Sequence, residues 1–267
     1  MTVPLFLQVA GMFFIPLLAV IIPLIIGRRY GSYQRRRKEH LQDTAIESVV
    51  ATANALLAFM LAFTFQISAN RYDARKELLM EEVKSIRTVY LRAGLIPEPY
   101  RSSTRKYLVE YVDMRVDLSK DRTKLDQVIF RNRQILDTLW NYSEALAAQD
   151  RSSEAYSLYT SSINAVVDAN HRRINMVLVF RIPVAVLWVL FIIGFISMLI
   201  LGYQFGVSGK GNLMVNLLLA TIFAAVMFLI LDLDRPETGV TEIDQKPLLT
   251  LQQELREKML NVRPVGP

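Results

Sequence analysis

The sequence predicts an all-α fold of four transmembrane helices, with an extramembrane helical domain inserted between spans 2 and 3. Four long stretches contain no Asp, Glu, Lys or Arg. At about 1.5 Å of rise per residue, each can cross the roughly 30 Å hydrocarbon core of a bilayer as a helix. Between the second and third stretches, apolar side chains recur at helical spacing and do not alternate as in a strand. The charge-free stretches are residues 1–27, 48–70, 182–209 and 211–231.

The composition supports this fold and excludes several kinds of site. The 267 residues are 52% hydrophobic and 21% charged, but all 31 Lys and Arg and all 25 Asp and Glu fall outside the four stretches. The chain contains no Cys and only two His, His40 and His171. We therefore expect no disulfide, no metal site and no bound cofactor. The first stretch is too long for a cleavable signal peptide and no Lys or Arg precedes it, so we expect a retained span.

The elements follow in order along the chain. A basic connector, residues 28–47, leads from span 1 into span 2, which continues without Gly or Pro and predicts a helix of about 50 residues from Thr44 to Ala93. Turn-forming residues then separate helices at about 98–119, at about 124–148 and from 153 into span 3. Spans 3 and 4 form a tight hairpin, and one amphipathic helix follows at about 246–262. The predicted domains are residues 1–70 (spans 1 and 2), 71–181 (extramembrane helical domain), 182–231 (spans 3 and 4) and 232–267 (extramembrane tail).

The short connectors predict an orientation in the membrane. The connector 28–47 carries six Lys or Arg, the hairpin between spans 3 and 4 carries one, and the segment before span 1 carries none. Because Lys and Arg accumulate in cytoplasmic loops, we expect both connectors in the cytoplasm and the helical domain and tail on the other side.

No motif predicts an enzyme. The hairpin loop is rich in glycine, but Gln204 stands where a phosphate-binding loop needs its first glycine and Gly211 where it needs Ser or Thr. Patterns of the HExxH, GxGxxG and GxSxG types do not occur. Lys and Arg are spread through mixed-charge helices, which argues against a nucleic-acid partner. The one dense basic cluster adjoins span 1, where orientation and anionic lipid explain it.

Span 2 concentrates polar residues on one helical face. Polar side chains in hydrocarbon are costly and normally face a partner helix or a water-filled path. The face therefore either lines a pore in a symmetric oligomer, with Phe59 as an apolar constriction, or joins span 2 to spans 1, 3 and 4. A stripe of small residues beside it, Ala51, Ala55, Ala58 and Ala62, allows close helix approach. The face comprises Ser48, Thr52, Ala55, Phe59, Ala62, Gln66 and Asn70, and it leaves out the polar residues Asn54, Thr64 and Ser68.

Charged residues mark the ends of spans 2 and 4. If these spans are antiparallel neighbours, both clusters lie at the same membrane face, where they either pair as a structural collar or form a charged ring at a pore mouth. A ring of Arg71, Arg75 and Lys76 would favour anions. The two clusters are Arg71, Asp73 and Arg75 after span 2, and Asp232, Asp234 and Arg235 after span 4.

Short segments along the chain carry a family resemblance. They are His40-Leu-Gln-Asp43, Leu56-Leu-Ala-Phe59, Arg71-Tyr-Asp-Ala-Arg75, Tyr90-Leu-Arg, Leu95-Ile-Pro-Glu-Pro99 and Leu231-Asp-Leu-Asp-Arg-Pro236. With the order of two spans, a helical insert, two spans and a short tail, they resemble a family of bacterial membrane proteins described as bestrophin-like, a domain of unknown function.

The resemblance implies an oligomeric anion channel whose second span lines the pore with an apolar, Phe-containing neck, here at Phe59 and Phe63. It also implies a helical insert in the cytosol, which is opposite to the orientation that the connector charges predict. We keep the orientation predicted by the connector charges. No acidic cluster here matches the calcium clasp of bestrophins.

We therefore expect a homo-oligomeric ion channel of the plasma (bacterial inner) membrane that contacts lipid and conducts an inorganic anion. The alternative is a non-conducting scaffold or sensor whose helical domain binds a protein partner. A transporter is less favoured, because no span holds an Asp, Glu, Lys or Arg to couple ions or protons.

Overall fold

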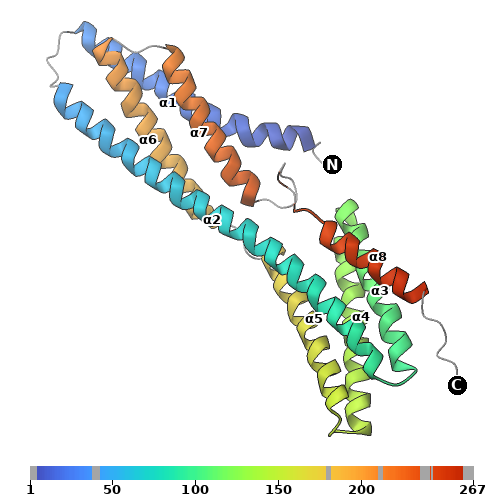
Figure 1. Ribbon diagram of the computed structural model, residues 1–267. Helices are drawn as coiled ribbons and strands as arrows, with labels where there is room; N and C mark the ends of the chain where they lie inside the picture. Colours follow the sequence, from blue (N-terminus) through green and yellow to red (C-terminus); the bar gives the residue numbers. More distant parts are fainter. Residues whose placement is uncertain are drawn as a thin grey trace. The chain divides into compact units, whose positions relative to one another are not determined.

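The computed structural model describes residues 5–37, 43–178, 182–209, 213–234, 241 and 243–260, and in these residues the fold is helical with no strand (Figure 1). Four helices are long and apolar enough to cross a membrane, so the all-α prediction with four candidate spans is confirmed. The long helices are α1 (Leu5–Arg36), α2 (Asp43–Arg92), α3 (Tyr100–Lys120), α4 (Leu125–Gln149), α5 (Glu154–Leu178), α6 (Val184–Ser208), α7 (Leu213–Asp234) and α8 (Lys246–Leu260).

The chain divides into two compact units. The first unit comprises Met1–Asp73 and Arg181–Glu242, and the second comprises Ala74–Phe180 and Ile243–Pro267. Helix α2 is continuous over 50 residues and contributes to both, as its sequence without Gly or Pro predicts. Two 3-10 turns, Ala93–Leu95 and Arg122–Lys124, precede α3 and α4.

In the first unit, helices α1 and α6 run parallel with their backbones in close contact. A Cβ atom added to Gly27 would lie 2.1 Å from the Leu199 carbonyl oxygen, and one added to Gly31 would lie 2.3 Å from that of Tyr203. On α6, a Cβ at Gly202 would lie 2.2 Å from the Leu24 carbonyl oxygen. Small residues four positions apart on both helices allow this approach, which is a common way for membrane helices to associate.

The rest of the first unit's core is apolar. Leu57 of α2, Leu190 of α6 and Phe223 of α7 belong to one buried cluster, which extends to Met227 and Ile230. Helix α1 continues through Pro16 and Pro23, as membrane helices tolerate.

The expectation that the helix from residue 153 runs into span 3 is wrong. Helix α5 ends at Leu178, Ile182 and Pro183 are not helical, and α6 begins at Val184. Proline lacks a backbone N–H and disfavours the helical conformation of the residue before it, so the chain starts a new helix after Pro183.

The second unit has its own apolar core. Buried residues at helical spacing on α2, α3, α4 and α5 pack together, among them Ile86, Tyr111, Leu139 and Ile163. Helix α8 adds three leucines, Leu248, Leu251 and Leu255, each fully buried. The predicted amphipathic tail helix is thus present, with its apolar face buried in this unit.

Candidate functional site: the uncovered face of the second span

The predicted polar face of span 2 lies on the surface of the chain. All seven of its residues have exposed side chains: Ser48, Thr52, Ala55, Phe59, Ala62, Gln66 and Asn70. The small residues beside them, Ala51 and Ala58, are exposed as well. This face is therefore not the one that joins α2 to the other spans, and that alternative is wrong for the single chain.

The opposite face of α2 holds the first unit together. Val50 and Leu57 are buried in its core, and Thr64 and Ser68 are fully buried. The Ser197 hydroxyl on α6 donates a hydrogen bond of 3.1 Å to the carbonyl oxygen of Ala53. Thr64 and Ser68, two of the polar residues that fall off the predicted face, are thus on the side that packs. The two faces are separated as the spacing predicts.

Local interactions organise the ends and the middle of the uncovered face. Near one end, Thr52 Oγ1 donates to the Ser48 carbonyl oxygen at 2.9 Å. At the other end, Gln66 Nε2 donates to Asn70 Oδ1 at 2.7 Å. Between them, the rings of Phe59 and Phe63 are stacked, with their centroids 6.4 Å apart.

Among the large apolar side chains that the structure describes in α2, Phe59 is the most exposed. Its exposed fraction is 65%, and that of Phe63 is 54%. A large apolar ring that its own chain leaves uncovered, between polar groups on either side, can contact lipid, another subunit or a narrow water-filled path. Of these, contact with another subunit or with a water-filled path gives the flanking polar groups a role, whereas lipid does not.

Arg71, where the charge-free part of α2 ends, and Asp234, the last residue of α7, lie together. The Nη1 atom of Arg71 is 3.7 Å from Asp234 Oδ1. The backbone N–H of Ile182 donates to the same Asp234 oxygen at 3.1 Å, and the N–H of Thr241 donates to Asp232 Oδ2 at 3.0 Å. Both aspartates are buried. They fix the chain where it enters α6 and leaves α7, which is a structural use of their charge.

The other predicted charges differ in exposure. Asp73 is exposed, Arg75 is buried, and Arg235 lies outside the residues that the structure describes. Of the two predicted clusters, Arg71 and Asp234 are brought within 3.7 Å of each other.

Two features of the first unit were missed from the sequence. The G-x-x-x-G spacing of Gly27 with Gly31, and of Gly202 with Gly206, is a readable signal for close helix contact. Asn216 is the other: it is buried on α7, and within the described residues neither atom of its amide group has a hydrogen-bond partner. A lone Asn in an apolar span is itself a signal, because such residues are costly in hydrocarbon.

The apolar helices and the helical core define the class of protein: a membrane protein with an all-helical, multi-span fold. A family model, the Bestrophin-like domain, matches residues 8–248. The chain therefore belongs to the bestrophin-like family, and the resemblance drawn from its short segments is confirmed.

Solved structures share the fold. A variant of a bacterial bestrophin homologue from Klebsiella pneumoniae is 16% identical with a TM-score of 0.69, over 92% of this chain and 98% of that one. Another structure of the homologue, phased with zinc, is 17% identical with a TM-score of 0.65, over 93% and 97%. A variant described as a membrane protein is 17% identical with a TM-score of 0.63, over 97% and 99%. No curated protein matches the chain in sequence.

Proposed function

We propose that the protein is a homo-oligomeric ion channel of the bacterial inner membrane, in which the uncovered face of α2 lines the pore and inorganic anions pass. The observation that carries the proposal is that all seven residues of this face are exposed in the single chain. In the apolar window of α2 only 17% of residues are buried, against 28 to 33% in the other three spans. The span with the smallest buried share is thus the one that carries the exposed polar face described above.

The neck of the proposed pore is at Phe59, with Phe63 stacked on it. An apolar ring of side chains gates by excluding water, while the hydroxyl and amide groups above and below it keep the rest of the path wet. The preference for anions is supported by the family resemblance. Arg71 adds little to it, because Asp234 lies 3.7 Å from its guanidinium.

In this proposal the second unit lies outside the membrane, inserted between spans 2 and 3. Its core is built by mixed-charge amphipathic helices, and Glu82, Arg115 and Arg173 meet inside it. Such a composition is typical of a domain in water and costly in hydrocarbon.

The test is ion flux from liposomes that contain the purified protein. Wild type is expected to release chloride, with a reversal potential in a salt gradient that shows anion preference. Phe59→Ala is expected to raise the flux, because a smaller side chain widens and wets the neck. Phe195→Ala is the matched control, since Phe195 is exposed on α6 and lies on a different helix.

Two outcomes contradict the proposal. Absence of flux from wild type in any salt argues for the alternative, a scaffold or sensor that does not conduct. A Phe59→Ala variant that conducts as wild type does removes Phe59 from the neck and leaves the pore without its proposed gate.

A further inference from the structure

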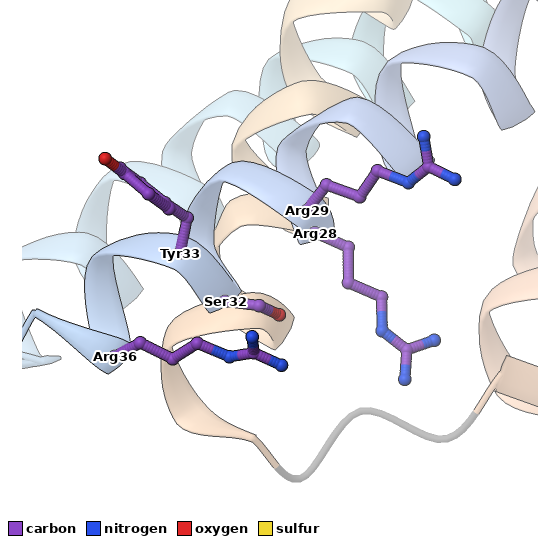
Figure 2. A pocket seen from close by; sticks show the side chains of 5 residues that line it. All are labelled: Arg28, Arg29, Ser32, Tyr33 and Arg36. Atoms are coloured by element: carbon purple, nitrogen blue, oxygen red, sulfur yellow. The ribbon is translucent and has the colours of Figure 1, made fainter.

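The last turns of α1 form a basic pocket. It has a volume of about 340 Å³ and is lined by Arg28, Arg29, Ser32, Tyr33 and Arg36 (Figure 2). Three of these five residues carry a guanidinium, two carry a hydroxyl, and none is an acid. The lining therefore offers only hydrogen-bond donors with full positive charge and hydroxyl groups, a chemistry that selects a compact anion.

The spacing of these residues gives the pocket its shape. Arg28, Ser32 and Arg36 follow one another at intervals of four, so they lie on one side of the helix. Figure 2 shows these three side chains extending to the same side of α1. With about 1.5 Å of rise per residue, Arg28 and Arg36 are roughly 12 Å apart along the axis, enough for one phosphate group between two guanidinium forks.

The pocket also lies where a membrane surface is expected. The 27 residues before Arg28 contain no charge, so the basic residues begin where the apolar helix ends. Tyr30 and Tyr33 beside them have exposed fractions of 57% and 50%. Tyr30 packs against Tyr203 of α6, with ring centroids 5.8 Å apart. Exposed tyrosines at the end of an apolar span are typical of the headgroup level of a bilayer.

We propose that this pocket binds the phosphate of an anionic phospholipid headgroup. Arginine pairs with phosphate oxygens through two parallel hydrogen bonds, and the hydroxyl of Ser32, on the same side of α1, adds a neutral donor. The three guanidinium groups of the lining favour a headgroup of net negative charge, such as phosphatidylglycerol, over phosphatidylcholine, whose choline cation they repel. This site is independent of the proposed pore on α2.

The test is native mass spectrometry of the full-length protein in detergent with added phosphatidylglycerol and phosphatidylcholine in equal amounts. Wild type is expected to retain phosphatidylglycerol preferentially. The double variant Arg29→Gln with Arg36→Gln is expected to lose about 25-fold in affinity for it, at about fivefold for each basic residue near an anionic lipid. Both residues are exposed, so the fold is expected to persist.

Two further variants distinguish specific binding in this pocket from non-specific electrostatic attraction between the protein and anionic lipid. Arg133→Gln with Arg151→Gln removes the same charge from exposed positions of the second unit and is expected to bind as wild type. Ser32→Ala keeps every charge and is expected to weaken binding through the lost hydroxyl. Should the arginine variant fail to fold, the Ser32→Ala variant decides the question.

Three results overturn the proposal. The first is equal retention of the two lipids by wild type. The second is an equal loss of affinity in the control double variant, or no loss when the Ser32 hydroxyl is removed. The third concerns the source of the phosphate: if inorganic phosphate alone binds at this pocket and phosphatidylglycerol does not, the occupant is a free anion and not a lipid.

Discussion

At the scale of single residues, Glu82 is a buried charge of the second unit that is held by several partners. Its carboxylate is fully buried and accepts hydrogen bonds from Tyr111 at 2.7 Å and from Arg115 at 3.2 Å, and it also pairs with Arg173. Burial, together with the negative charge of Glu82, raises the pKa of Tyr111 well above its ordinary value, so this hydroxyl stays protonated and donates. One carboxylate thus pairs with two arginines and joins α2, α3 and α5.

Removing this carboxylate is expected to be costly. Glu82→Gln leaves two arginines without their counter-charge, and we expect a loss of roughly 3 to 5 kcal/mol in the free energy of unfolding of the second unit. Denaturant unfolding followed by circular dichroism measures it. The neighbouring Glu81→Gln is the matched control: Glu81 pairs with Arg172 at the surface, so we expect a change below about 1 kcal/mol. Equal losses in the two variants would contradict the role given to Glu82.

At the scale of elements, the contact of α1 with α6 depends on glycine. Because an added Cβ at Gly202 would lie 2.2 Å from backbone, the helices must separate to admit it. We expect Gly202→Ala to lower the stability of the first unit by about 1 to 3 kcal/mol, which is typical of overpacking. Thermal unfolding in detergent is the measurement.

Gly11 provides the control for this variant. A Cβ there would meet only the flexible end of Ile15, at 3.9 Å. Gly11→Ala is therefore expected to be neutral or slightly stabilising, since alanine favours a helix. A Gly202→Ala variant as stable as Gly11→Ala would show that the two backbones are farther apart than described.

The elements were largely predictable from the sequence, and their contacts were not. Charge-free runs and the absence of Gly and Pro between Thr44 and Ala93 fixed the helices, because helix length and polarity are local properties. The separation of Thr64 and Ser68 from the polar face followed from spacing alone. In contrast, the hydrogen bond of Ser197 with Ala53 depends on how α6 crosses α2. The charges at the ends of spans 2 and 4 predicted either a paired collar or a charged ring, and only the fold brings Arg71 to Asp234.

At the scale of the whole molecule, the uncovered face of α2 predicts association of several copies. Exposed small residues along it, such as Ala58, allow helices of neighbouring subunits to approach closely. We expect the wild-type protein to be an oligomer larger than a dimer in mild detergent or nanodiscs, by light scattering or mass photometry. A dimer cannot enclose a path with one helical face from each subunit.

A bulky side chain on this face is expected to weaken association. Ala58→Trp places a large ring where neighbouring helices approach, and we expect a shift toward monomer. Ala225→Trp, at an exposed alanine of α7, is the matched control and is expected to assemble as wild type. A monomeric wild-type protein would contradict the proposed channel as a whole.

The parallel course of α1 and α6 has a consequence for topology. Two neighbouring helices that cross a bilayer in the same direction end on the same side, so the connector after α1 and the hairpin after α6 share one membrane face, whichever face it is. The sequence has no native thiol. A single cysteine introduced at Arg36 or Ser208 would therefore be the only target for a reagent that cannot cross membranes, and labelling at either position reports the sidedness of both connectors.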